Sequence, residues 1–302
     1  MPKVFYSNGK LLLTGEYAIL DGAKGLAVPT KFAQSLEIAS NKEAILSWKS
    51  IDYLGETWFS AKFNPKDVSL YSSSDATIAT TLQQILLGAK KLNSKFLNEE
   101  LGIAVETKLT FPRNWGLGTS STLINNIAQW AQVNAHQLLW NSFGGSGYDI
   151  SCAQHNTPLI YWIENKLPKA NPIHFNPMFK DQIYFVHLNH KQNSKTAISN
   201  YRNKVFDTKK LILEINKITT AIPNTKNLLE FENLIEKHEA TLARILEVSP
   251  IKEKLFSDYS GSIKSLGGWG GDLIMATGNE KTPEYFKSKG FDTILNFKEM
   301  LL

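Results

Sequence analysis

The chain has 302 residues, 42% of them hydrophobic and 20% charged, with 19 glycines and 11 prolines. This composition excludes collagen-like, low-complexity and disordered proteins, and the length predicts one large unit or about two domains. The formal net charge of +5 comes from lysines scattered among acidic residues, with no basic block. We therefore expect no nucleic-acid partner.

The single cysteine, Cys152, excludes an internal disulfide and a cysteine-based zinc cluster. No stretch approaches the roughly 18 apolar residues of a membrane span, and the first ten residues lack the apolar core of a signal peptide. We expect a soluble, cytoplasmic protein with no membrane partner.

The first half of the chain alternates strand-like and helix-like segments. An apolar run at 10–14 and an alternating, β-branched run at 103–111 predict strands. Apolar residues spaced three and four apart predict helices over 75–92 and 119–139. The second of these helices directly follows a glycine-rich turn.

The second half begins with buried strands predicted at 159–163 and 183–188. Three prolines in 168–177 predict a connection between lobes, so we expect domains at 1–167 and 168–302. The other expected elements are helices at 194–218 and 226–248, a strand at 273–277, a short helix from residue 283 and a strand at 293–297. This pattern predicts an α+β fold and not a doubly wound one.

The most informative segment, 112–122, leads from a predicted strand through Gly116 and Gly118 into a helix. Glycine lets a backbone approach an anion closely, and a helix start offers unpaired amides and a positive dipole end. The segment is neither a Walker A nor a Rossmann sequence. By itself it fits either a phosphate loop or a purely structural helix cap.

A second segment, 144–152, holds a lone carboxylate, Asp149, after three glycines. Asp149 is the only acidic residue between positions 107 and 163. It fits either a turn aspartate bonded to its own backbone or a catalytic base beside a phosphate. Two further segments combine glycine with charge: 264–272, with four glycines in five positions, and 8–20, which carries Lys10 and Glu16.

In this order the four segments resemble the motifs of the GHMP kinases, a family named for its galactokinases, homoserine kinases, mevalonate kinases and phosphomevalonate kinases. Residues 112–121 resemble the family's phosphate loop, Pro-x-x-x-Gly-Leu-Gly-Ser-Ser. Three other segments most resemble the phosphomevalonate and mevalonate kinase branch. They are the Gly-Glu-Tyr-Ala run at 15–18, the stretch 145–150 with Ala135-His136 upstream, and the Gly-Gly-Asp that ends 264–272.

The resemblance implies a two-lobed α+β fold, with an N-terminal lobe of the ribosomal-protein-S5-like domain 2 type and a ferredoxin-like C-terminal lobe. It implies ATP and Mg²⁺ as cofactors. Asp149 matches the base that takes the acceptor's proton, Lys10 the lysine that stabilises charge beside it, and Ser120 the serine that binds Mg²⁺. The residues that match the ATP-binding loop are Gly116, Leu117, Gly118, Thr119, Ser120 and Ser121.

A second set of positions corresponds to substrate-binding elements. The substrate-recognition loops of the family follow a strand and lead into a helix, and the segment 187–196 does the same in this sequence. The expected substrate-binding residues are Glu16, Lys191, Ser194, Lys195, Gly267, Gly268, Gly270 and Gly271.

The sequence departs from the family pattern at several points. Asn8 replaces a proline before Gly-Lys, and Trp115 replaces a small residue before Gly-Leu-Gly. Trp269 replaces a glycine in the closing motif, where it would narrow the pocket. No acidic residue in 107–148 matches the metal-binding glutamate of mevalonate and homoserine kinases. The resemblance then implies that Glu16 or water replaces it, or that ATP and Ser120 chiefly hold the metal, and His136 is a weaker substitute.

The resemblance implies transfer of the γ-phosphoryl group of ATP to phosphomevalonate or mevalonate, a step of isoprenoid precursor synthesis. A kinase for a sugar or another small alcohol is an alternative, because a fold does not fix a substrate. A nucleotide-binding pseudokinase with a regulatory or partner-binding role is another, favoured by Trp269 and the missing glutamate. The oligomeric state stays open between monomer and homodimer.

Overall fold

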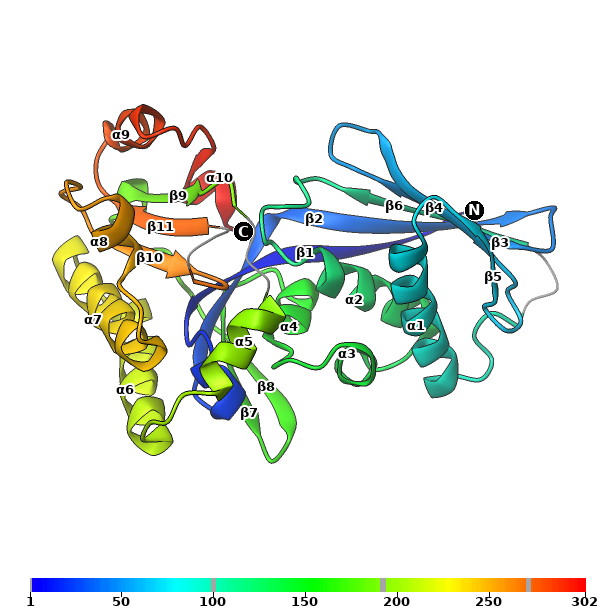
Figure 1. The fold of residues 1–302 in the computed structure, drawn as a ribbon, viewed down its shortest axis with the longest axis horizontal. Coiled ribbons are helices and arrows are strands. Elements are labelled where there is room, and N and C mark those ends of the chain that lie inside the picture. Colours follow the sequence, from blue (N-terminus) through cyan, green and yellow to red (C-terminus); the bar gives the residue numbers. More distant parts are fainter. Residues whose placement is uncertain (1, 99–101, 191–193, 270–272) are drawn as a thin grey trace. The chain divides into compact units, whose positions relative to one another are not determined.

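The computed structural model describes residues 2–98, 102–190, 194–269 and 273–302. Helices and strands mix along the chain, as the predicted α+β class requires (Figure 1). The chain forms two compact units, one of Met1–Gly9, Phe32–Arg113 and Leu117–Gln154, the other of Lys10–Lys31, Asn114–Gly116 and His155–Leu302. Neither unit is continuous in sequence, so the predicted domain boundary between residues 167 and 168 stays a prediction.

The first unit is a sheet covered by helices. Its strands follow the order β5-β4-β3-β6-β2, with β3 and β6 parallel and the other pairs along this path antiparallel. The strands are β1 (Lys3–Thr14) and β2 (Gly25–Asn41), both of which continue into the second unit, β3 (Leu46–Ile51), β4 (Thr57–Phe63), β5 (Leu70–Ser73) and β6 (Gly102–Leu109). The helices are α1 (Ala76–Leu92), α2 (Thr119–Ala131), α3 (Ala135–Ser142) and α4 (Tyr148–Gln154).

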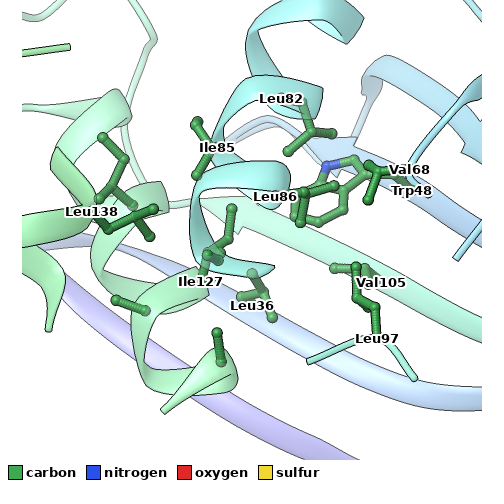
Figure 2. Close-up of a cluster of buried hydrophobic side chains, with 14 of the residues drawn as sticks. Leu36, Trp48, Val68, Leu82, Ile85, Leu86, Leu97, Val105, Ile127 and Leu138 are labelled. Atoms are coloured by element: carbon green, nitrogen blue, oxygen red, sulfur yellow. The ribbon is translucent and has the colours of Figure 1, made fainter. Parts of the chain in front are cut away.

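The core of this unit lies between α1 and the sheet. Leu82 and Leu86 on α1 and Trp48 and Val105 on the strands belong to one cluster of buried side chains (Figure 2). The helix begins where the sequence predicts it, because the Asp75 side chain accepts bonds from two first-turn amides. Burying each such aliphatic side chain contributes about 1.5–3 kcal/mol to folding.

The predicted helix over 119–139 is wrong in one respect, since it is two helices. Gln132 adopts a left-handed conformation (φ 55°) that ends α2, and the Asn134 side chain accepts a bond from the Gln137 amide that starts α3. The apolar spacing continues through this break, so periodicity alone did not reveal it.

The second unit contains an antiparallel sheet in the order β10-β11-β9-β12. Strands β7 and β8 pair with each other outside this four-stranded sheet, and β7 also pairs with residues Gly25–Ala27 of β2. The strands are β7 (Leu159–Glu164), β8 (Leu167–Pro172), β9 (Ile183–His187), β10 (Ile263–Leu266), β11 (Leu273–Thr277) and β12 (Ile294–Asn296). The helices are η1 (Ala18–Asp21), η2 (Lys180–Gln182), α5 (Ser194–Arg202), α6 (Thr208–Ala221), η3 (Ile222–Asn224), α7 (Leu228–Leu246), α8 (Ile251–Leu255), α9 (Thr282–Ser288) and α10 (Phe297–Met300).

Two predictions in this unit need correction. The expected helix over 194–218 is split into α5 and α6, because Asp207 caps a new helix through the Lys210 amide. The proline-rich connection at 168–177 begins as strand β8, which pairs with β7 along its length. β8 ends the strand order, and an edge strand tolerates prolines that an inner strand does not.

Candidate active site

The glycine-rich segment between β6 and α2 is built to open a helix without a side-chain cap. Gly116 and Gly118 have φ of 69° and 91°, a region that favours glycine. Among the described residues, no side chain caps the start of α2. The Ser121 and Thr122 hydroxyls instead donate to the Gly118 carbonyl oxygen, at 2.9 and 3.0 Å. Without a capping side-chain oxygen, the positive end of this helix is suited to bind an anion.

Two side chains hold the loop by its carbonyl groups. Lys10 Nζ donates to the Gly116 oxygen at 2.9 Å, and His187 Nε2 lies 3.1 Å from the Asn114 oxygen. Because a carbonyl only accepts, His187 Nε2 carries the proton. A trans peptide places N–H opposite C=O, so the Trp115 and Leu117 amides point away from these two side chains. Lys10 and the loop, both predicted site elements, are therefore in direct contact.

Asp149 is the second residue of α4 and is half-buried. Its Oδ1 accepts a bond from the Ile150 amide at 3.1 Å. A carboxylate in the first turn of a helix is stabilised by the helix amides and dipole. Asp149 belongs to the first unit and Lys10 to the second, so their expected pairing stays a prediction.

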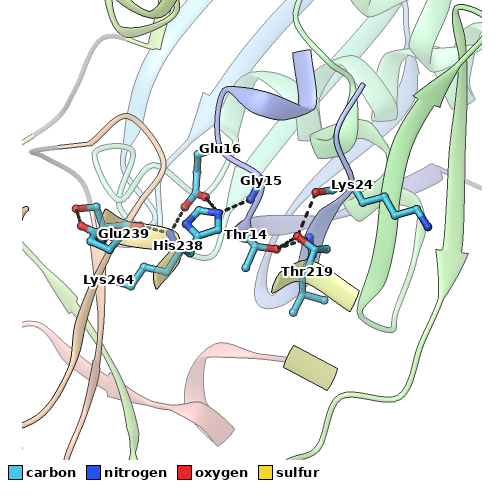
Figure 3. Close-up of polar contacts among 10 residues, drawn as sticks. Thr14, Gly15, Glu16, Lys24, Thr219, His238, Glu239 and Lys264 are labelled. Atoms are coloured by element: carbon cyan, nitrogen blue, oxygen red, sulfur yellow. Dashed lines mark hydrogen bonds and ion pairs between the residues drawn. The ribbon is translucent and has the colours of Figure 1, made fainter. Parts of the chain in front are cut away.

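A buried ionic cluster joins the segment after β1 to β10 and α7 (Figure 3). Lys264 Nζ donates to Glu16 Oε1 at 2.5 Å, and the two side chains are 0% and 3% exposed. Lys264 also donates to the Ser265 carbonyl at 2.8 Å, while the Glu239 carboxylate accepts from the Ser265 amide and hydroxyl. The ion pair therefore connects the segment 8–20, which contains Glu16, with the segment 264–272, which begins at Lys264. The predicted contact of Glu16 with substrate stays a prediction.

His238 supports the same segment from α7 in its neutral form. Its Nε2 accepts a bond from the Gly15 amide at 2.9 Å, which leaves Nε2 without a proton. Burial, and then the nearby Lys264 charge, lower the pKa of His238 well below its usual value. Burial raises the pKa of Glu16, with Lys264 acting in the opposite direction. Glu16 Oε2 lies 3.4 Å from the unprotonated Nε2 and has no hydrogen-bond partner among the described residues.

The closing motif is described as far as Trp269. Gly267 adopts φ 71°, and Gly268 is half-buried. The Trp269 ring packs against a cluster that includes Tyr17 and Tyr201. The narrowing of a pocket by this tryptophan stays a prediction.

Neither a family model nor a curated protein matches this sequence. Solved structures do match it over nearly its whole length. Mevalonate kinase from Methanococcus jannaschii aligns at a TM-score of 0.71 and 16% identity, covering 98% of each chain. Phosphomevalonate kinase from Streptococcus pneumoniae, solved with phosphomevalonate and AMPPNP, aligns at 0.70 and 13%, covering 97% of this chain and 99% of that one.

Galactokinase from Lactococcus lactis, solved with galactose, aligns at a TM-score of 0.64 and 12% identity, covering 95% of this chain and 88% of that one. All three belong to the family that the motifs resemble. The chain has the GHMP kinase fold. The predicted resemblance is thereby confirmed at the level of fold.

Several predicted site positions of this GHMP kinase fold lie outside the described residues or side chains. Lys191, Gly270 and Gly271 fall outside the described residues. Ser194 and Lys195 begin α5, and their side chains are not described. Their substrate-binding roles stay predictions.

A magnesium site in this GHMP kinase fold would rest on few protein ligands. The described part of the chain holds no group of three His, Cys, Asp or Glu side chains able to bind a metal. Mg²⁺ commonly takes one or two protein ligands together with phosphate oxygens and water. The Ser120 side chain, exposed in the first turn of α2, fits that requirement.

No helix in the described residues is long and apolar enough to cross a membrane.

Sequence reasoning overlooked three residues that shape this site. His187 and Lys264 lie within segments that the motifs indicated, but nothing in their spacing revealed their partners. His238 falls in the apolar stripe of the predicted helix 226–248, and its complete burial follows that stripe. A histidine in such a stripe signals a buried polar partner, which here is the Gly15 amide.

Proposed function

We propose that this chain is an ATP-dependent small-molecule kinase. The observation that carries the proposal is the bond from Lys10 Nζ to the Gly116 carbonyl, at 2.9 Å. It brings a cation to a glycine loop that opens a helix without a side-chain cap. The bond holds that loop in place, and the amides of an uncapped helix start favour the charge of a nucleotide's phosphates. The GHMP kinase fold supports the same conclusion.

In the proposed reaction, the acceptor hydroxyl gives its proton to the Asp149 carboxylate as its oxygen bonds to the γ-phosphorus of ATP. The bond from that phosphorus to the β,γ-bridging oxygen breaks, and ADP leaves. Lys10 favours the ionised form of Asp149 and offsets the charge that develops during transfer. Mg²⁺, when bound with ATP, would neutralise phosphate charge with Ser120 as its protein ligand. Such catalysis consists mostly of positioning and charge stabilisation.

For the acceptor we propose phosphomevalonate or mevalonate, because the segments at 15–18, 145–150 and 264–272 resemble that branch most. The 191–195 segment supplies two lysines suited to an anionic acceptor. A sugar or another small alcohol is the alternative acceptor. We further propose that the protein acts in the cytoplasm as a monomer or homodimer.

A pseudokinase is the second candidate function. Trp269 in the closing motif and the absence of acidic residues from 107–148 favour it, whereas the presence of Lys10, Ser120 and Asp149 together favours an enzyme.

The deciding experiment is a coupled ADP-release assay with ATP and Mg²⁺. The acceptor panel is mevalonate, 5-phosphomevalonate, homoserine and galactose. Acceptor-dependent ADP release supports the kinase, and the preferred acceptor identifies the branch. ATP binding without turnover on any of the four would contradict the proposed acceptors and favour the pseudokinase.

A further inference from the structure

The turn that leads into Asp149 has almost no side chains with which to hold its own shape. Gly144, Gly145 and Gly147 adopt φ of 75°, 96° and 83°. A Cβ added to Gly144 or Gly145 would meet nothing within 4 Å. These two glycines are therefore required by backbone conformation and not by crowding, and neither supplies a side chain that could hold the turn.

Helix α3 supplies two ring N–H groups to this turn. Trp140 Nε1 donates to the Gly145 carbonyl oxygen at 3.1 Å, and His136 Nε2 lies 3.1 Å from the Gly147 carbonyl oxygen. A carbonyl only accepts, so His136 Nε2 carries a proton in this contact. The two residues are four positions apart and so share one face of α3, where their ring centroids are 5.7 Å apart.

The carbonyl that His136 contacts is the one that starts α4. The Gly147 oxygen also accepts the Ser151 amide at 3.2 Å, and His136 Nε2 lies 3.2 Å from the Ser151 hydroxyl. Asp149 lies inside this first turn of α4. A shift of the Gly147 carbonyl therefore moves the backbone that carries the Asp149 carboxylate.

We propose that His136 and Trp140 are positioning residues that set the location of Asp149 through the Gly145 and Gly147 carbonyls. The proposal rests on the proposed function, in which Asp149 accepts the acceptor's proton. The two rings act through the backbone, so their loss changes the geometry of proton transfer and leaves the nucleotide loop in place. A misplacement of about 1 Å at a reacting group costs roughly 100-fold in rate.

The test uses conservative variants of the full-length chain. Trp140→Phe keeps an aromatic ring and removes the N–H, and His136→Phe does the same. His136→Gln restores a side-chain N–H donor. Trp130→Phe is the matched control, because Trp130 packs edge-to-face on Phe96 in the same unit. For each variant, kcat and KM for ATP are measured with the acceptor that the wild type uses, and amide hydrogen exchange is followed over residues 145–151.

Both variants that lose the N–H should lower kcat by about 10-fold or more, with KM for ATP within about 3-fold of wild type. His136→Gln should recover most of that loss, and the Ser151 amide should exchange faster in the two N–H-deleted variants only. The proposal is overturned if both keep kcat within about 3-fold of wild type, or if Trp130→Phe loses as much.

The exchange experiment separates this proposal from the proposed function. A wild-type protein without turnover on any of the four acceptors would contradict the proposed reaction with these acceptors, whatever the variants do. Unchanged exchange at Ser151 in both N–H-deleted variants would overturn the role of α3, whether or not the wild type is active. Faster exchange in those variants, with Trp130→Phe unchanged, would support it.

Discussion

Lys10 Nζ donates a hydrogen bond to the carbonyl oxygen of Gly116, which lies 106 positions later in the sequence. The bond joins strand β1 to the glycine loop before α2 and places a positive charge at that loop. Its removal therefore has a direct consequence for the proposed reaction.

Replacing Lys10 should affect turnover strongly. Lys10→Met removes both the charge and the bond to Gly116, so we expect kcat to fall by about 100-fold to 1,000-fold. Lys10→Arg keeps the charge with a different donor geometry and should lose less. Lys3→Met, at an exposed position on the same strand, is the control and should leave kcat unchanged. A loss below about 5-fold in Lys10→Met, measured by ADP release, would contradict the role of this lysine.

Replacing Asp149 should separate chemistry from nucleotide binding. Asp149→Asn keeps the size of the side chain and removes its ability to accept a proton, so turnover should fall by at least about 100-fold. ATP affinity, measured by calorimetric titration, should stay nearly unchanged because the phosphate loop is untouched. If the variant keeps activity within a few-fold of wild type, Asp149 is not the base.

Lys264 should be important for stability. Lys264→Met leaves the Glu16 carboxylate buried without its ion-pair partner, a change that costs about 3–5 kcal/mol in the free energy of unfolding. Urea unfolding measures this loss. Adding Glu16→Gln to Lys264→Met should recover part of it, because the buried charge is then removed.

The control for this prediction is Arg244→Gln, which breaks an exposed ion pair with Glu214 at 3.1 Å. We expect that variant to lose less than about 1 kcal/mol. Equal losses in Lys264→Met and Arg244→Gln would show that the buried pair has no special role.

The stability of the protein should depend on pH through Glu239. Burial raises the pKa of Glu239 to about 7 from its usual 4.5, although Lys264 and the bonds from Ser265 act in the opposite direction. Between these two pH values the folded state binds a proton that the unfolded chain has released. The contribution of Glu239 to the free energy of unfolding should therefore fall as pH rises from about 4.5 to 7, by roughly 3 kcal/mol, and stay level above that range.

Glu239→Gln isolates this effect, because glutamine does not titrate and can still accept a bond from Ser265. His238 has a lowered pKa and contributes a loss of stability at acid pH, but it does so in both proteins and cancels in the comparison. The unfolding free energy of the wild type minus that of Glu239→Gln should therefore fall by roughly 3 kcal/mol between pH 4.5 and 7 and stay level above pH 7. A difference that is constant from pH 4.5 to 7.5 would contradict the raised pKa.

Local sequence determined most of the individual elements. The apolar stripes predicted α1 and α7 closely, and the run at 273–277 is strand β11. These predictions hold because helix and strand periods depend on neighbouring residues alone. The breaks between α2 and α3 and between α5 and α6 were missed, because a cap can interrupt a helix without interrupting its apolar spacing.

The order of the glycine-bearing motifs, read from the sequence by itself, was enough to predict the GHMP kinase fold. Only the tertiary structure decided which polar groups are partners. The contacts between Lys10 and Gly116, Glu16 and Lys264, and Gly15 and His238 join positions more than 100 residues apart. No local spacing encodes such pairs, because they form where separate elements bury polar groups together and each group must find a partner there.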